Sequence, residues 1–330
     1  MSASGEHPRV SVIVPTYRRP GFLLDTLASI LSGSYSDFEV LVANDGPAED
    51  VVAAQARFPD SRIEWLNRPE RLGVGRNNID AFRRARGEYI ANLHDDDQWA
   101  PAFLSTLVPI LEDHPDVVVA FADHFVVNEQ GVVDEMISDR ASRHWGRSGL
   151  AEGVHRPFLE IAAVDQSISI PSAAVFRRSA VNLADYPDEI GQCYDVWTAY
   201  MLARSGGAAW YVPQRLTYYR AHSDNYSHNP GARRAAAVVY FRQRLLDDGA
   251  LTECESLLKR RLAGDRRHLA VALARDGRLG EARWQTRRAA RLDPSPRTIA
   301  LAAAVHVAPG LTRRALERRR RVLAGSAGSD

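Results

Sequence analysis

Hydrophobic and polar positions follow two different periods over the first hundred residues. Short apolar runs at residues 9–14, 39–43 and 62–66 have the length and β-branched content of buried strands. The stretches between them repeat apolar residues at helical spacing; one begins at Pro20, a favoured first helical residue, and another ends at Gly87, a favoured residue just past a last turn. Strands that alternate with helices of this length predict an α/β fold with a doubly wound, mostly parallel sheet flanked by helices.

The hydrophobic pattern after residue 100 is less regular, and from about residue 227 it becomes helical throughout. We expect a hairpin turn at residues 128–131, whereas residues 134–157 show no clear periodicity and are interpreted as a mobile loop. From about Ser227, helix follows helix in a sequence rich in Ala, Leu and Arg. We therefore place a domain boundary there, with one domain at residues 1–226 and an all-α C-terminal region at residues 227–330.

Residues 269–294 resemble one tetratricopeptide-like helical hairpin. Gly277 and Gly280 flank the expected turn, and Ala282 and Ala289 stand where small packing residues are needed. A solenoid of such units needs about three repeats for stability. A single unit predicts a cap that packs on the first domain; a separate binding module is the alternative.

The composition indicates a globular protein of the reducing cytoplasm. Hydrophobic residues make up 45% of the chain and charged residues 25%, and the net charge of +1 gives no overall attraction to nucleic acid. Cys193 and Cys254 form neither a disulfide framework nor a zinc motif. Neither a secretory signal nor the ~20 apolar residues of a membrane span is expected. Arginine supplies every basic side chain except Lys259, which indicates a GC-rich bacterial genome.

The last residues carry the locally basic character of the chain. Arg313, Arg314 and residues 318–321 follow an apolar helical pattern. Two interpretations are open: contact with anionic lipid at the inner face of the membrane, or a solvated C-terminal helix.

Three consecutive carboxylates, Asp95, Asp96 and Asp97, follow an apolar run that ends at Leu93. Adjacent carboxylates repel one another, so they are tolerable in solvent or against a cation. Mg²⁺ or Mn²⁺ is usually held by one or two carboxylates together with phosphate oxygens and water, and ligands of open α/β sheets bind at the carboxyl ends of strands. The run predicts a metal and phosphate site; a solvated acidic turn is the alternative.

Several motifs occur in a fixed order: VSVIVPTYRRP, VLVANDG and RLGVGRNNIDAFRRARGEYIANLHDDDQWAP. Together they resemble the nucleotide-sugar-binding half of family 2 glycosyltransferases, and a weaker likeness continues through SAAVFRRS, YDVW and LTYYRAH to about Ser227. The resemblance implies a GT-A fold, with a nucleotide-sugar-binding half at residues 9–100 and an acceptor half at residues 101–226. It also implies an inverting, metal-dependent transfer from a UDP-, dTDP- or GDP-linked sugar to a hydroxyl of a glycan, lipid or small molecule.

The resemblance assigns roles around the donor nucleotide. Pro15, Thr16 and Tyr17 match the loop that lines the base, and Asp45 matches the aspartate that contacts it. Arg76 matches a residue that faces the donor phosphates, a task suited to a guanidinium. An Asx turn is the alternative for Asp45, and a surface ion pair is the alternative for Arg76.

The resemblance also assigns the acidic residues. Where the family usually has Leu-Asp-x-Asp-Asp, this chain places His94 at the first aspartate. Asp95 matches a ribose or outer-sphere neighbour and Asp96 the direct metal ligand, with Asp97 and His222 as further candidates for holding Mg²⁺ or Mn²⁺. His94 is expected to bind the nucleotide sugar through a hydrogen bond, although a ligand role is open, and His222 has a structural hydrogen-bonding role as its alternative.

The general base is the main departure from the family pattern. The usual Glu-Asp pair is Gln192-Cys193 here, so Asp195 is the expected catalytic base, with Asp165 and Asp188 in reserve. An aspartate in the first turn of a helix also interacts favourably with the helix dipole, which is the alternative. The rival from another class is a catalytically degenerate GT-A-like scaffold that recruits partners through its helical repeat.

Overall fold

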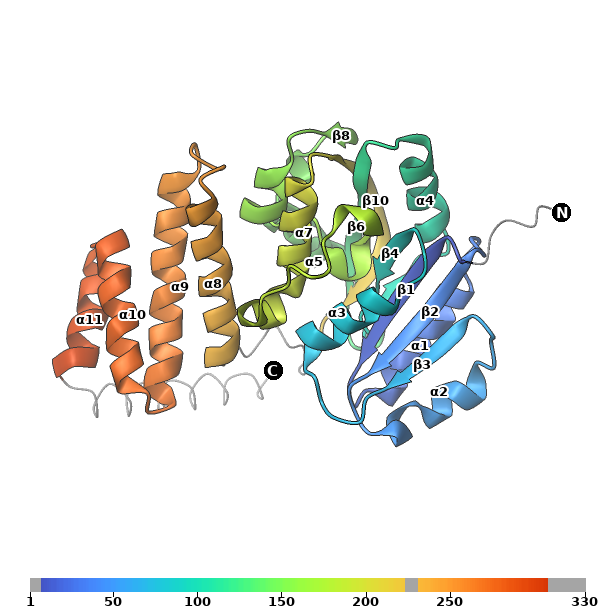
Figure 1. Ribbon diagram of the computed structural model, residues 1–330, viewed down its shortest axis with the longest axis horizontal. Helices are drawn as coiled ribbons and strands as arrows, with labels where there is room; N and C mark the ends of the chain where they lie inside the picture. Colours follow the sequence, from blue (N-terminus) through green and yellow to red (C-terminus); the bar gives the residue numbers. More distant parts are fainter. Residues whose placement is uncertain (1–6, 223–230, 308–330) are drawn as a thin grey trace. The chain divides into compact units, whose positions relative to one another are not determined.

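The computed structural model describes residues 7–222 and 231–307 of the chain, which divides into two compact units, Met1–Asn225 and Tyr226–Asp330 (Figure 1). Within the described part of the first unit, ten strands form one sheet in the order β3-β2-β1-β4-β9-β6-β10-β5, with β7 and β8 paired outside this path.

The amino-terminal half of the sheet is parallel. Its strands are β1 (Val10–Thr16), β2 (Phe38–Asn44), β3 (Ile63–Asn67) and β4 (Tyr89–Asn92). β1 pairs in parallel with both β2 and β4, and β2 pairs in parallel with β3. The carboxyl ends of these strands therefore meet at one edge, where the loops that follow them gather.

The second half of the sheet is mixed. β6 (Val117–Val127) and β10 (Ala208–Arg220) form a long parallel pair, whereas β9 (Ala174–Arg177) runs antiparallel between β4 and β6. Three short strands pair antiparallel with β10 or β6: β5 (Gln98–Trp99), β8 (Gly153–His155) and β7 (Val133–Asp134). The expected mostly parallel α/β sheet is confirmed.

Helices cover both faces of the sheet, which explains the uninterrupted apolar strands. Val12 and Val14 of β1 pack in one core with α1 and α4, while Ile13 packs in the other core with α3 and α7. The helical segments of this unit are α1 (Pro20–Leu31), η1 (Ala48–Val51), α2 (Val52–Arg57), α3 (Val74–Arg84), α4 (Phe103–Asp113), α5 (Glu135–His144), η2 (Arg147–Gly149), η3 (Glu160–Val164), α6 (Ile170–Ala173), η4 (Arg178–Ala180), η5 (Asp188–Cys193) and α7 (Tyr194–Arg204).

The interpretation of residues 134–157 as a loop without regular structure is wrong. The segment contains α5, which begins after Asp134, whose side chain accepts a hydrogen bond from the N–H of Ile137. The residues that α5 buries are Ser138 and Ser142, whereas Met136 and Ile137 are exposed. A helix that buries hydroxyls and exposes apolar residues has no hydrophobic periodicity to detect. The expected turn at residues 128–131 is confirmed as the link between β6 and β7.

The second unit is helical throughout its described residues. Its helices are α8 (Ala232–Asp248), α9 (Glu255–Arg275), α10 (Leu279–Leu292) and α11 (Pro296–Val307) (Figure 1). α9 and α10 form the expected hairpin: Gly277, with φ of +78°, makes the turn, and Ala282 and Ala289 are fully buried. Arg313, Arg314 and residues 318–321 lie outside the described residues. Among the helices described, each is too short or too polar to span a bilayer.

Candidate functional site

The predicted base loop and the acidic run meet where β1 and β4 end. Thr16 Oγ1 donates a 2.8 Å hydrogen bond to Asp95 Oδ2, and the N–H of Tyr17 donates to the same oxygen at 3.3 Å. Pro15 precedes Thr16 on β1 and pairs with Ala43 of β2. Residues separated by almost eighty positions in the chain are thus adjacent because their strands pair in parallel.

The three aspartates are buried, which excludes a solvated acidic turn. Their exposed fractions are 5% for Asp95, 9% for Asp96 and 2% for Asp97. Burial raises the pKa of Asp95 to about 7 and raises the pKa of Asp97 well above its usual value. Burial also acts on Asp96, but its electrostatic interactions with His94 and Arg19 and the hydrogen bond from His222 hold its pKa below the usual value. Buried carboxylates at this density require a positive partner.

Asp97 connects three segments of the fold. Its Oδ1 accepts a hydrogen bond from the N–H of Arg220 at 3.0 Å, and its Oδ2 accepts one from Ser172 Oγ at 2.5 Å. Thr26 Oγ1 donates to its main-chain oxygen at 2.8 Å. Both side-chain oxygens of Asp97 thus already have partners, so this residue holds α1, α6 and β10 around the acidic run.

A divalent cation fits the donor set that the fold assembles. One ring nitrogen of His94 and one oxygen each of Asp96 and Asp97 all lie within 4.8 Å of one another. His222 approaches Asp96 separately, with Nε2 3.0 Å from Oδ2. The predicted metal ligands Asp97 and His222 therefore both lie close to Asp96, the third predicted ligand. His94 lies in the same group. Imidazole and carboxylate ligands together are typical of divalent metal sites.

Two arginines at this site were not found by sequence reasoning. Arg19 Nη1 contacts Asp96 Oδ2 and lies 3.3 Å from Asp95 Oδ1, and Arg220 Nε donates to the main-chain oxygen of Asp96 at 3.0 Å. The pair of arginines before Pro20 was the available signal for Arg19. No local pattern marks Arg220, because its role depends on the antiparallel pairing of β10 with β5, which follows the acidic run.

Asp45 follows β2, and its N–H donates a hydrogen bond to the main-chain oxygen of Thr16 in the predicted base loop. Its carboxylate is 6% exposed and accepts hydrogen bonds from the N–H groups of Leu72 at 2.6 Å and Gly73 at 2.8 Å. The Asx turn in this segment belongs instead to Asn44, whose Oδ1 accepts from the N–H of Gly46. The guanidinium of Arg71 lies 4.1 Å from the centre of the Tyr17 ring and 3.9 Å from Asp45. An aromatic ring, a carboxylate and a guanidinium are therefore adjacent at this edge of the sheet.

Arg76 lies on α3, and the candidate bases lie on α7, in η5 and after η3. Arg76 Nη2 is 2.9 Å from Asp188 Oδ2, and both side chains are largely exposed, so the surface ion pair is present. Asp195 lies in the first turn of α7, and its charge raises the pKa of His94 against the larger lowering effect of burial. Asp165 follows η3.

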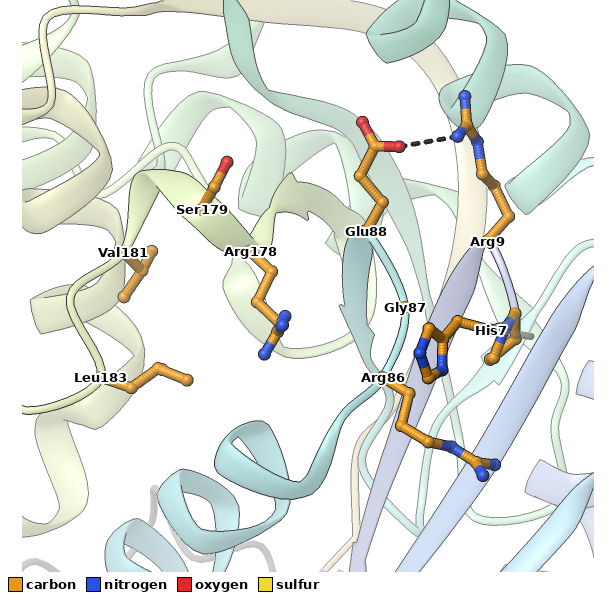
Figure 2. A pocket seen from close by; sticks show the side chains of 10 residues that line it. His7, Arg9, Arg86, Gly87, Glu88, Arg178, Ser179, Val181 and Leu183 are labelled. Atoms are coloured by element: carbon orange, nitrogen blue, oxygen red, sulfur yellow. Dashed lines mark hydrogen bonds and ion pairs between the residues drawn. The ribbon is translucent and has the colours of Figure 1, made fainter. Parts of the chain in front are cut away.

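A separate cavity of 600 Å³ lies at the opposite ends of the same strands (Figure 2). Figure 2 shows Val181 and Leu183 on one side of this cavity and His7 and Arg86 on the other. It lies beside Arg9 and Glu88, which precede β1 and β4. The acidic run follows the carboxyl ends of these strands, so this cavity is not part of the candidate site.

Sequence comparisons connect this geometry to known proteins. A family model described as glycosyl transferase family 2 matches residues 11–182, a range that contains the acidic run and ends before α7. An uncharacterized protein of Mycobacterium tuberculosis is 30% identical over 256 residues, which is 75% of each chain. A glucosyltransferase of Escherichia coli, named as acting from UDP-Glc on α-D-GlcNAc-diphosphoundecaprenol, is 24% identical over 129 residues, or 39% of this chain and 51% of that one.

Solved structures share the architecture. TarS residues 1–349 of S. aureus align with a TM-score of 0.59 at 14% identity, over 95% of this chain and 91% of that one. A mannosyltransferase of Pyrobaculum calidifontis, solved with GDP-Man and Mn²⁺, aligns with a TM-score of 0.54 at 22% identity, over 94% and 84% of the two chains. At these identities the likeness concerns the fold, which is the GT-A type. The chain belongs to glycosyltransferase family 2 and is a transferase that moves a sugar from a nucleotide sugar.

Proposed function

We propose that this transferase is metal-dependent and inverts the anomeric centre of a nucleoside diphosphate sugar. The observation that carries the proposal is the burial of Asp95, Asp96 and Asp97, with Asp95 hydrogen-bonded to the loop of Thr16 and Tyr17. Within this proposal, residues 1–226 are the catalytic domain, with the donor bound by residues 9–100 and the acceptor by residues 101–226. Residues 227–330 are a helical extension.

The donor nucleotide would lie along the carboxyl ends of β1 and β2. The ring of Tyr17 and the main chain of Pro15 and Thr16 offer a surface for the base, and each Asp45 oxygen keeps an acceptor position beside its bond to the backbone. Asp95 is placed to accept a hydrogen bond from the ribose. UDP-, dTDP- and GDP-linked donors all fit this chemistry; the E. coli relative is named for UDP-Glc and the Pyrobaculum structure contains GDP-Man.

The diphosphate would face the acidic run. Asp96, with Asp97, His222 and His94 nearby, would hold Mg²⁺ or Mn²⁺. When bound, such an ion supplies Lewis-acid neutralisation of the charge on the departing diphosphate. Arg76, at the start of α3, would orient the same phosphates through its guanidinium after exchanging its partner Asp188 for the donor.

Asp195 would remove the proton from the acceptor hydroxyl as that oxygen attacks the anomeric carbon. Its place in the first turn of α7, next to buried Tyr194, supports this role, since the Tyr194 hydroxyl contacts His94. A single displacement inverts the centre, and positioning of donor and acceptor contributes much of the acceleration. Acceptors in polysaccharide, glycolipid or glycoside synthesis all offer such a hydroxyl, and the E. coli relative is named for a lipid-linked one. We place the enzyme in the cytoplasm, where the basic C-terminus would contact the inner face of the membrane.

A thermal-shift panel tests the donor and the cation together. UDP, GDP, dTDP and CMP are each added to the full chain with Mn²⁺ or with EDTA. We expect one nucleoside diphosphate to raise the melting temperature only with Mn²⁺, and we expect Asp96→Asn to abolish that rise. The matched control is Asp113→Asn, an exposed carboxylate on α4. Full transferase activity of Asp96→Asn with Mn²⁺ would show that the metal assignment is wrong, and a degenerate scaffold would release no nucleoside diphosphate from any sugar nucleotide.

A further inference from the structure

The hydrogen bonds of His94 define which of its ring nitrogens carries the proton. Nε2 lies 2.9 Å from the hydroxyl oxygen of Tyr194, and that hydroxyl lies 2.9 Å from Asn92 Oδ1. Tyr194 is 2% exposed and Asn92 is fully buried. The donor and acceptor in each of these two hydrogen bonds can therefore be deduced by starting from Asn92.

The amide of Asn92 has only one orientation that satisfies its neighbours. Its Nδ2 donates to the main-chain oxygen of Ile13 at 3.1 Å and to Asn78 Oδ1 at 3.0 Å. A carbonyl oxygen only accepts, so the NH₂ group must face Ile13. Asn78 is fixed in the same way, because its own Nδ2 donates to the main-chain oxygen of Val74 at 2.7 Å. Oδ1 of Asn92 therefore faces Tyr194 and accepts its proton.

The tautomer of His94 follows. The Tyr194 hydroxyl has one hydrogen, which it gives to Asn92, so it accepts a hydrogen bond from Nε2–H of His94. A neutral imidazole has one N–H, which leaves Nδ1 with a lone pair. This is the arrangement in which a partner on one ring nitrogen orients the other toward a metal.

The His94 ring lies beside the candidate cation site. A ring nitrogen of His94 lies within 4.8 Å of oxygens of Asp96 and Asp97. Asp97 already accepts hydrogen bonds at both of its oxygens, from Ser172 and from the N–H of Arg220. Its oxygens are therefore the less available ligands of the group.

We propose that His94 binds the catalytic cation directly through Nδ1, with Tyr194 and Asn92 as positioning residues that fix its tautomer. The inference rests on the metal dependence proposed above. It adds an imidazole nitrogen to the carboxylates and His222, whereas an aspartate at position 94 would add only oxygen. Imidazole nitrogen favours first-row transition metals over Mg²⁺. The site therefore selects cations such as Co²⁺ and Mn²⁺ over Mg²⁺, and His94 sets that selectivity.

Cation titration of the full chain tests the proposal without measuring transfer. Co²⁺ and Mg²⁺ are titrated alone by calorimetry, and the visible absorption of bound Co²⁺ reports its ligands. We expect His94→Ala to weaken Co²⁺ binding at least tenfold and to change the Co²⁺ spectrum. We expect His94→Asp to reduce the ratio of Co²⁺ to Mg²⁺ affinity by a similar factor. His144→Ala removes an exposed imidazole of α5 and should change neither measurement.

Two further variants separate the possible failures. Tyr194→Phe, checked for folding by its thermal melt, should weaken Co²⁺ binding about tenfold, the usual lower range for loss of a residue that orients a metal ligand. If His94→Ala and His94→Asp bind Co²⁺ with the wild-type affinity and spectrum while Asp96→Asn binds none, His94 is not a ligand and the metal-dependent function still stands. If the wild-type chain binds no cation even with a nucleoside diphosphate, the proposed function itself fails.

Discussion

A Cβ atom added to Gly75 would lie 1.9 Å from the carbonyl oxygen of Gly191. The first turn of α3 therefore packs backbone against backbone on η5, the segment that leads into α7 and Asp195. The contact joins the residues expected to bind the donor to those expected to bind the acceptor. It also brings Arg76 within 2.9 Å of Asp188.

Gly75→Ala tests this contact. The displaced backbone of η5 should lower the free energy of unfolding by about 1–3 kcal/mol, the usual cost of overpacking. Transfer activity should fall further, because Asp195 moves with η5. Gly21→Ala on α1 is the control: a Cβ there meets nothing within 4 Å, so chemical denaturation should show an unchanged or slightly raised stability. Equal stability of the two variants would contradict the close approach.

Local sequence patterns predicted the parallel half of the sheet because β1, β2 and β4 are buried along their whole length and mostly apolar, and α1 buries one apolar face. They also located the acidic run, since Leu93 and the residues before it mark a buried strand end. α5 was missed because Ser138 and Ser142 form its buried face. Arg220 was missed because the antiparallel pairing of β10 with β5, the strand that directly follows the acidic run, brings it to Asp96.

The roles of individual aspartates could not be separated by position alone. Asp96 and Asp97 are neighbours in the chain, yet Asp97 has both oxygens engaged by Ser172 and the N–H of Arg220, whereas Asp96 faces Arg19 and His222. Asp97 stabilises the fold because Ser172 and Arg220, both distant in the chain, donate hydrogen bonds to it. Such long-range partners are visible only in the tertiary structure.

Asp96 and Asp97 should therefore respond differently to substitution. Asp97→Ala leaves the hydroxyl of Ser172 and the N–H of Arg220 without an acceptor, which costs about 1–3 kcal/mol of stability for each buried group. Asp96→Asn keeps the shape of its side chain and should lose activity with a smaller change in stability. Urea denaturation and a transferase assay on both variants check this. An Asp97→Ala protein as stable as the wild type would show that Asp97 does not brace the site.

Arg76 is expected to act on the donor rather than on stability. Its ion pair with Asp188 is exposed at both ends, and such pairs contribute about 0–1 kcal/mol. Arg76→Ala should therefore leave the melting temperature nearly unchanged but raise KM for the donor at least about tenfold, since a hydrogen bond to a charged group is worth about 1.5–3 kcal/mol. Asp188→Asn removes the partner and should leave KM unchanged or lower it. Matching kinetic losses in both variants would instead identify the pair as a structural link.

His124 should make stability depend on pH through a second buried cluster. Arg147, 2% exposed, contacts His124 Nδ1, lies 3.2 Å from Asp123 Oδ1 and donates to the main-chain oxygen of Ser167. Burial and then the charge of Arg147, with a smaller effect of Arg215, lower the pKa of His124 to about 3, against the opposing charge of Asp123. The folded protein therefore keeps His124 neutral at pH values where the unfolded chain, with a pKa of about 6.5, protonates it.

The sign of the effect follows from this difference. As the pH falls below about 6.5, the unfolded state binds a proton that the folded state does not, so stability falls by up to about 1.4 kcal/mol per pH unit until about pH 3. Between about pH 7.5 and pH 5 the wild type should lose about 2 kcal/mol more than His124→Gln, which keeps an acceptor for Arg147 but does not titrate. Urea denaturation at each pH measures the difference, and His144→Gln, at an exposed position, should follow the wild type. If the stability of the wild type and of His124→Gln changed with pH in the same way, His124 would titrate alike in the folded and unfolded states. The buried cluster would then accept a protonated His124 beside Arg147, which contradicts the prediction.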